Sequence, residues 1–417
     1  MNFYPKNHSE IFEIIIKEKK RQEQNLNLIA SENFVSEPIL EVQGSVLTNK
    51  YAEGYPKKRY YDGCEYIDEI EKIAIEKLKK LFNVKFVNVQ PHSGSQANMA
   101  VFQALLEPCD VILGMSLNDG GHLTHGSKFS FSGKFFRSYS YGVSRETEMI
   151  DYQKVREIAL QVKPKLIIAG ASAYSRIIDF KEFRKIADEV NSYLMVDIAH
   201  IAGLISAGLH PCPFLAQADV VTSTTHKTLR GPRGGIILSN NEEIMKKINK
   251  GVFPGIQGGP LMNVIAAKAL AFEEALQDDF KIYQQQILKN AIALANTFLK
   301  LDYRLVSGKT ENHLILIDIK HKYPNLNGKI VSEILQKVNI IVNKNVIPFE
   351  TEKVFNTSGI RIGTPAMTTR GFKEKEFIET AYLIDKILNN YQNEEIVQEV
   401  FKKALLLTKK FPFYNKK

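Results

Sequence analysis

The feature that most constrains the fold of this 417-residue chain is an alternation of short apolar runs with helical patterns. The runs are rich in Val, Ile and Leu, and they occupy residues 86–89, 111–113, 166–168, 193–197, 220–222 and 235–238. Helical periodicity separates most of them, as in residues 96–106 and 180–190. Strands that alternate with helices predict an α/β fold with a mainly parallel sheet covered on both faces. Binding residues are then expected at the carboxyl ends of the strands.

The segments on either side of this alternation predict further elements. About the first 25 residues have the pattern of an amphipathic helix capped near Ser9, residues 26–63 have loop character, and residues 65–82 have helical periodicity. A helical stretch covers residues 261–301, and strands and helices follow at 303–306, 313–319, 329–337, 340–343 and 373–389. We expect an N-terminal helical arm, a large domain and a smaller α+β C-terminal domain, spanning residues 1–45, 46–285 and 286–417 respectively.

Composition excludes several classes of protein. With 44% hydrophobic and 24% charged residues, the chain is typical of a soluble globular protein and not of a disordered or fibrous one. No run approaches the ~20 apolar residues that a membrane helix needs, and residues 1–24 lack the apolar block of a secretory signal. Three widely spaced cysteines (Cys64, Cys109 and Cys212) indicate neither a disulfide framework nor a zinc site. We expect a cytoplasmic protein that does not enter a membrane.

The net charge of +9 raises the question of nucleic-acid binding. The basic residues are scattered, and only short clusters occur, such as residues 17–21 and the C-terminal tail. A nucleic-acid binder more typically has a basic stripe interleaved with aromatic residues, or a recognisable module. The charge pattern therefore favours a solvated surface, whose positive field could also attract anionic small molecules.

The strongest local signal is the segment of residues 220–235, in which Lys227 leaves a predicted strand and precedes a glycine-rich turn. A lysine in such a cleft can lose solvent, which lowers its pKa and makes the amine available for a Schiff base. A lysine after a strand is more often an ordinary surface residue. Asp197 ends another apolar strand and places a carboxylate at the same edge, where it could hold the pyridine nitrogen of pyridoxal phosphate protonated. The alternative is an aspartate that caps a helix.

Two further segments follow predicted strands. Ser93, Gly94 and Ser95 open a helix, and small residues at a helix N-terminus present backbone N–H groups to a phosphate, although an ordinary capped helix has the same pattern. His122 and His125 are three residues apart, but no cysteine or carboxylate accompanies them at ligand spacing, so no metal is expected. Stacking on the ring of an aromatic cofactor is a better use of His122, whereas a structural role suits His125.

Together these segments occur in the order found in fold-type I pyridoxal-phosphate enzymes, and the chain resembles the serine hydroxymethyltransferase family in particular. The similarity runs from about residue 15 to residue 390, and its most specific stretches are residues 28–33, 47–55, 59–61, 89–98, 120–126, 196–203, 224–235 and 358–365. The resemblance implies reversible conversion of serine and tetrahydrofolate to glycine and 5,10-methylenetetrahydrofolate. It also implies a homodimer with shared active sites.

The resemblance assigns roles toward the cofactor. Lys227 forms the covalent aldimine with pyridoxal 5′-phosphate, Asp197 holds the pyridine nitrogen, and His122 stacks on the ring. The other cofactor-binding positions are Tyr51, Ser93, Gly94, Ser95, Ser172, His200, Thr224, Gly258 and Gly259, of which the last two come from a neighbouring subunit.

The resemblance also assigns roles toward the substrates. Arg361 takes the amino-acid carboxylate, and Ser31, Tyr61 and His200 lie near it. Glu53 is the acid/base group, and it reaches the site from the partner chain together with Tyr51 and Tyr61. His226 tunes specificity. The folate site is lined by Glu53, Leu117, Gly121, His122, Leu123, Asn345, Lys353, Val354 and Phe355.

Some differences and alternatives remain. Asp119 and Asn263 stand where the family often has histidine, and Lys57-Lys58 replaces a more usual Gly-Lys, which leaves the shape of the folate pocket less defined. Arg361 could form a structural ion pair instead, and Tyr61 could be a core aromatic. Two other functions stay open: an aldolase of the same fold that cleaves threonine-like β-hydroxy amino acids, and an RNA-binding protein that uses the basic surface.

Overall fold

A seven-stranded sheet organises the larger part of the molecule. The computed structural model describes residues 9–353, 355–412 and 414. The sheet order is β4-β10-β9-β8-β7-β5-β6, in which β10 runs antiparallel to both neighbours and the strands from β9 to β6 are parallel. The strands are β4 (Phe86–Asn88), β5 (Val111–Met115), β6 (Arg137–Tyr141), β7 (Leu166–Ala169), β8 (Tyr193–Asp197), β9 (Val220–Thr224) and β10 (Gly235–Ser239).

Helices cover both faces of this sheet. Successive strand residues alternate between two cores: Leu194 and Val221 belong to one, whereas Met195 and Val220 belong to the other. Helices α3 (Glu65–Phe82), α6 (Tyr152–Val162), α7 (Phe180–Glu189), α8 (Ala202–Ser206) and α10 (Met262–Ala275) pack on the first face. Helices α4 (Gly94–Leu105), α5 (Phe131–Phe135) and α9 (Glu242–Lys250) pack on the second. The expected α/β fold with a mainly parallel, doubly covered sheet is confirmed.

One strand of this sheet was not expected. Strand β6 has the sequence Arg-Ser-Tyr-Ser-Tyr, pairs only with β5, and lies at the edge of the sheet. Most of its side chains are exposed, so the strand needs no apolar run. A prediction based on apolar runs therefore does not detect it.

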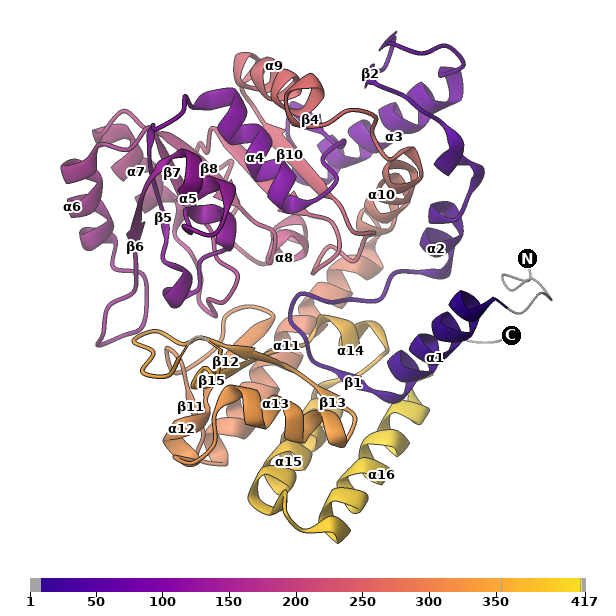
Figure 1. Cartoon of the computed structure of the whole chain (residues 1–417), viewed down its shortest axis with the longest axis vertical. Helices are drawn as coiled ribbons and strands as arrows, with labels where there is room; N and C mark the ends of the chain where they lie inside the picture. Colours follow the sequence, from indigo (N-terminus) through magenta and orange to yellow (C-terminus); the bar gives the residue numbers. More distant parts are fainter. Residues whose placement is uncertain (1–8, 354, 413, 415–417) are drawn as a thin grey trace.

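A second core lies in the lower part of the molecule (Figure 1), around an antiparallel four-stranded sheet in the order β11-β12-β15-β14. Its strands are β11 (Arg304–Leu305), β12 (Leu314–Asp318), β14 (Asn343–Asn345) and β15 (Gly359–Gly363). The helices are α12 (Ile319–Lys322), α13 (Gly328–Lys337), α14 (Pro365–Thr369), α15 (Glu374–Asn390) and α16 (Glu394–Lys410). Helix α11 (Asp278–Lys300) joins the two parts, since Ile287 belongs to the first core and Leu294 to the second. The domain boundary at residue 286 stays a prediction.

The N-terminal segment lies against this second part. Strand β1 (Leu26–Asn27) pairs in parallel with β13 (Ile340–Ile341), and α1 (Glu10–Gln24) packs on α16, so that indigo and yellow helices lie together in Figure 1. Helix α2 (Glu37–Gln43) and a hairpin of β2 (Gly54–Tyr55) and β3 (Lys58–Arg59) then lead back to the large sheet. Within the described residues, we find no helix with the length and apolar character that crossing a membrane requires.

Buried histidines make stability depend on pH. Burial lowers the pKa to about 4 for His122 and His210 and to about 3 for His226 and His313. In the unfolded chain these groups take up protons near pH 6.5, so below that pH the unfolded state binds more protons than the native state. We therefore expect the free energy of unfolding to fall as the pH is lowered from 6.5 toward 4.

Thermal unfolding at about pH 7.5 and about pH 5 checks this expectation. His210 packs against Phe180 and does not line the cavity described below, so His210→Phe removes one such group without touching that cavity. The variant should lose less Tm on acidification than the unmodified chain does. An equal loss would mean that His210 does not contribute to the pH dependence.

Candidate active site

A cavity of about 380 Å³ lies at the carboxyl ends of the parallel strands. It brings together residues that follow β4, β5, β7, β8 and β9 with one arginine of β15. The lining residues are Ser31, Glu32, Ser93, Gly94, Ser95, Asn98, His122, His125, Ala171, Ser172, Asp197, Ala199, His200, Thr224, His226, Lys227, Arg233 and Arg361.

Lys227 lies just beyond the end of β9 and is only 9% exposed. Burial lowers the pKa of its amine to about 8, while the Asp197 carboxylate acts in the opposite direction. The backbone carbonyl of Lys227 accepts a hydrogen bond of 2.8 Å from Nδ2 of Asn33, which holds the turn after the strand. The neutral form of this amine, which a nucleophile requires, is thus more populated near neutral pH than in an ordinary lysine.

Asp197 ends β8 and is buried below the cavity. Burial disfavours its ionised form, but the hydrogen bond and charge of His125, together with Asn98, hold the pKa of the carboxyl below its ordinary value. Its Oδ2 atom accepts from Nδ2 of Asn98 at 2.9 Å and contacts Nε2 of His125 at 3.0 Å. Asn98 is fixed in turn by Thr222, which donates to its amide oxygen at 2.7 Å. The carboxylate therefore stays ionised and oriented.

The N-terminus of α4 forms a cradle for an anion. The Ser93 hydroxyl accepts from the backbone N–H of Gln96 at 3.2 Å, and the helix begins directly at Gly94. A Cβ atom at Gly94 would lie 2.6 Å from the methyl group of Thr224, so only glycine fits beside that strand end. Unbonded N–H groups and the helix dipole together favour a phosphate here.

Neutral imidazoles surround the space between these groups. Burial lowers the pKa of His122 to about 4, and its Nδ1 atom lies 2.7 Å from the hydroxyl of Thr124. Burial likewise lowers the pKa of His200, whose Nδ1 atom lies 3.2 Å from Nε2 of His313. The Nδ1 atom of His226 is buried without a partner among the described residues. It is thus available for a polar ligand group in the cavity.

Arg361 enters the cavity from β15, where it pairs with Asn343 of β14. The guanidinium is fixed by two bonds, from Nε to Oδ1 of Asn343 at 3.2 Å and from Nη1 to the carbonyl of Ser172 at 2.7 Å. Burial lowers its pKa to about 10, so the charge is kept at neutral pH. Nη2 makes no hydrogen bond to another described residue, which suits a site for a carboxylate.

These features fit pyridoxal phosphate. A buried amine for its aldehyde, an ionised carboxylate for its pyridine nitrogen and a helix N-terminus for its phosphate face one cavity. Sequence reasoning missed Asn98, His313 and Arg233. Asn98 could have been identified, because it belongs to the family-like stretch of residues 89–98 and lies four positions after Gly94 on the same helix.

The remaining predicted residues do not line this cavity. Five of them form a separate cluster around the β2–β3 hairpin. The ring centres of Tyr51 and Tyr61 lie 5.2 Å apart. A Cβ atom added at Gly258 would lie 3.0 Å from the Glu53 carboxylate, and one added at Gly259 would lie 3.1 Å from the Tyr51 ring. The predicted folate residues Leu117, Leu123, Lys353 and Phe355 are exposed, Gly121 is buried and Asn345 is half-buried. Val354 lies outside the described residues.

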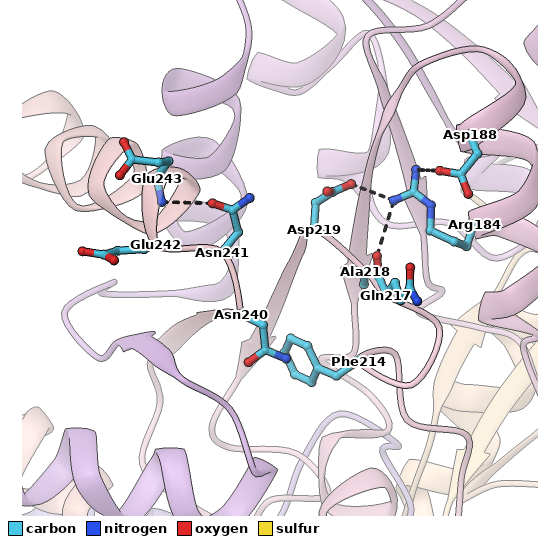
Figure 2. A pocket seen from close by; sticks show the side chains of 10 residues that line it. All are labelled: Arg184, Asp188, Phe214, Gln217, Ala218, Asp219, Asn240, Asn241, Glu242 and Glu243. Carbon is cyan, nitrogen blue, oxygen red and sulfur yellow. Dashed lines mark hydrogen bonds and ion pairs between the residues drawn. The ribbon is translucent and has the colours of Figure 1, made fainter.

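A larger hollow, of about 730 Å³, lies elsewhere and contains none of the predicted residues (Figure 2). There the Arg184 guanidinium forms ion pairs of 2.8 Å with both Asp188 and Asp219, and Asn241 caps the N-terminus of α9. These groups satisfy one another, so size alone does not make this hollow the active site.

Comparisons with known proteins decide the family. A family model described as serine hydroxymethyltransferase matches residues 5–384. The chain belongs to the serine hydroxymethyltransferase family. It is 64% identical over 411 residues to the serine hydroxymethyltransferase of Phytoplasma mali (strain AT), covering 99% of this chain and 98% of that protein. The protein of the same name from Onion yellows phytoplasma (strain OY-M) is 63% identical over 402 residues, or 96% and 97% of the two chains.

Membership in the family confirms the predicted activity. The chain is a transferase that interconverts serine and glycine, with pyridoxal phosphate as cofactor and tetrahydrofolate as co-substrate. This reaction supplies glycine and one-carbon units. The family therefore decides the main activity against the aldolase and RNA-binding alternatives.

Proposed function

We propose the following roles for the residues of this chain in serine hydroxymethyl transfer, and we propose that a second copy of the chain completes each site. The observation that carries the proposal is the placement of Lys227, Asp197, the start of α4 and Arg361 around one cavity. Pyridoxal phosphate, when bound, supplies a ring that withdraws electrons from the α-carbon of the amino acid.

Four groups hold the cofactor. Lys227 would attach to its aldehyde carbon with loss of the aldehyde oxygen as water, and the Asp197 carboxylate would accept a hydrogen bond from the pyridine N–H. The N–H groups at Ser93–Ser95 bind the phosphate, while the neutral His122 ring covers one face of the cofactor. Ser172, His200 and Thr224 complete the cofactor contacts, and the unpartnered Nδ1 atom of His226 tunes specificity beside Lys227.

Arg361 binds the carboxylate of serine or glycine, with Ser31 beside it in the cavity. A planar guanidinium can make two parallel hydrogen bonds to a carboxylate, and this fixes the direction in which the amino acid lies. Tetrahydrofolate then binds over Leu117, Gly121, Leu123, Asn345, Lys353, Val354 and Phe355. Cleavage of threonine-like β-hydroxy amino acids would use the same amino-acid site without folate.

Glu53 acts in the cavity of a second copy of the chain. In one chain, Tyr51, Glu53, Tyr61, Gly258 and Gly259 lie together but do not line the chain's own cavity. Tyr51 is 55% and Tyr61 46% exposed, which leaves these rings for a partner. In a two-fold symmetric dimer each copy would receive this cluster from the other, with Glu53 moving a proton at the serine hydroxyl and Tyr61 beside it.

Mixed dimers of two inactive variants test this arrangement. Glu53→Gln and Lys227→Ala should each be nearly inactive, because a general acid/base is worth ~10²–10⁴-fold and no other amine replaces Lys227. Co-refolding of equal amounts should place both changes in one site of each mixed dimer and leave the other site intact. With random pairing, about a quarter of the unmodified activity should return.

The result distinguishes the two geometries. If Glu53 served the cavity of its own chain, every site would carry one change and no activity would return. A mixture that exchanges subunits and stays inactive would therefore contradict the shared site. The refolded Glu53→Gln chain alone controls for activity that does not need this carboxylate.

We also propose a cytoplasmic location. The three cysteines form no disulfide among the described residues, and Cys109 is an exposed thiol. Unpaired thiols are typical of a reducing compartment.

A further inference from the structure

Lys268 is a fully buried lysine outside the cavity. It lies on α10 among apolar residues and is only 1% exposed. Its Nζ atom donates to three backbone carbonyls: Val89 at 2.7 Å, Pro91 at 3.0 Å and Gly235 at 2.9 Å. Three donated bonds use all three protons of the ammonium form, so the three carbonyls favour the charged amine, whereas burial acts against it and lowers the pKa of Lys268 to about 7.

The three carbonyls lie where the phosphate loop begins. Residues 89–92 lead from the end of β4 to Ser93, and Gly235 opens the neighbouring strand β10. Two glycines make this packing possible: a Cβ at Gly234 would lie 2.4 Å from Cε of Lys268, and a Cβ at Gly235 would lie 2.3 Å from the carbonyl of Ser93. Lys268 thus fixes the backbone directly below the start of α4.

Gln90 lies between two of these carbonyls and extends the contact to the β2–β3 hairpin. It is 2% exposed, and its Nε2 atom donates to the Gly54 carbonyl at 2.9 Å and to Glu71 at 2.8 Å. Gly54 directly follows Glu53. The Gln90 carbonyl accepts from Nε2 of Gln257 at 3.0 Å, in the segment that precedes Gly258. One short buried segment therefore connects the phosphate loop to Glu53 and to the segment before the two glycines.

A purely stabilising role explains Lys268 poorly. Removing an ammonium from water is unfavourable even after relaxation, and an apolar side chain of similar volume would fill the same space. What the ammonium provides and a methionine cannot is a fixed position for three carbonyls. Two of these flank Gln90, and the third adjoins the glycine turn after Lys227.

We propose that Lys268 and Gln90 are positioning residues: Lys268 sets the phosphate loop, and Gln90 sets the Glu53 hairpin relative to that loop. The part that concerns Glu53 rests on the role given to it in the proposed function. Neither residue lines the cavity.

Cofactor binding to the chain freed of cofactor tests the first part. Lys268→Met keeps the volume of the side chain and removes the three donors. The variant should bind pyridoxal phosphate at least about tenfold more weakly, which corresponds to the loss of about one charge-assisted hydrogen bond to the phosphate. Its affinity for pyridoxal, which lacks the phosphate, should change less than threefold. Equilibrium titration followed by absorbance measures both affinities.

Lys322→Met is the control, since Lys322 also donates to a backbone carbonyl, that of Leu301, but is half-buried on α12 and ion-paired with Asp385, away from the phosphate loop. It should lower Tm without changing the ratio of the two affinities. If Lys268→Met also lowers Tm and leaves that ratio unchanged, Lys268 is only structural and the proposal fails. If Lys268→Met fails to fold, Lys268→Gln replaces it, because its amide keeps two of the donated protons. Lys268→Gln should lower the ratio of pyridoxal phosphate affinity to pyridoxal affinity by a smaller factor. An unchanged ratio would again contradict the proposal.

A double-mutant cycle tests the second part. Gln90→Met should lower folate-dependent turnover at least about tenfold while pyridoxal phosphate affinity stays within threefold, and adding it to Glu53→Gln should cause little further loss. Independent, multiplying effects would show that Gln90 does not act through Glu53. If Glu53→Gln itself kept full turnover, the role of Glu53 would be wrong, whereas the result for Lys268 would stand.

Discussion

Replacement of Lys227 by alanine should abolish covalent attachment of pyridoxal phosphate and reduce turnover of serine by about a thousandfold or more. The Lys227 side chain is buried, and burial lowers the pKa of its amine to about 8, so it is the group in the cavity suited to react as a neutral nucleophile. The start of α4, Asp197 and His122 are unchanged in the variant. It should therefore still bind the cofactor, without a covalent bond.

Borohydride reduction followed by mass spectrometry measures the attachment, and the rate of glycine formation measures turnover. Lys386→Ala is a suitable control, because Lys386 forms an ion pair with Glu399 between helices α15 and α16, neither of which lines the cavity. The control should keep both the covalent attachment of pyridoxal phosphate and the rate of glycine formation. A Lys227→Ala chain that still carried covalent cofactor would place the reactive amine elsewhere.

Replacement of Arg361 by alanine should weaken serine and glycine binding by about a hundredfold or more, because truncating one partner of a buried charge pair is worth ~2–5 kcal/mol. The substrate carboxylate would enter a buried site without its cation. Cofactor binding should change much less, since neither Lys227, Asp197 nor the start of α4 is a hydrogen-bond partner of Arg361. Titration of the cofactor absorbance with serine measures this effect separately from catalysis.

The serine affinity of Arg361→Lys should lie between those of the unmodified chain and Arg361→Ala, because an ammonium keeps the charge but cannot make two parallel bonds to a carboxylate. Arg156→Ala removes an exposed arginine paired with Glu189 and should leave serine binding unchanged. Near-normal serine affinity in Arg361→Ala would show that the carboxylate binds elsewhere.

The strands that could be predicted from the sequence are those buried on both faces. Residues 193–197 form a continuous apolar run that ends in aspartate, and β8 has the same bounds. Strand β6 escaped because its exposed face carries polar residues, and β1 escaped because two residues have no readable period. Helix α16 was also missed, although its apolar face packs in the second core.

In the site, too, the sequence reveals residues with a local pattern and not those that act through tertiary contacts. Lys227 and Asp197 could be recognised because each follows a strand directly and has a chemically distinctive side chain. Asn98 and His313 act through hydrogen bonds to Asp197 and His200, and such contacts join residues about 100 positions apart that only the folded chain brings together. Lys268 has the sequence environment of an ordinary helical lysine, and only the fold reveals that its ammonium is enclosed by carbonyls.

The pairing of β1 with β13 has a consequence for synthesis on the ribosome. Residues 26–27 emerge early, but their partner strand, residues 340–341, is made more than 300 residues later. Arg370 then donates to carbonyls of both Glu23 and Thr408, so the beginning of the chain is fastened only when its last helix is present. The large sheet can fold during translation, whereas α1, with Ile11 and Ile14 more than half exposed, must wait. Helix α1 is thus made long before the helix it packs on, and its exposed apolar side chains need protection from aggregation in a nascent chain.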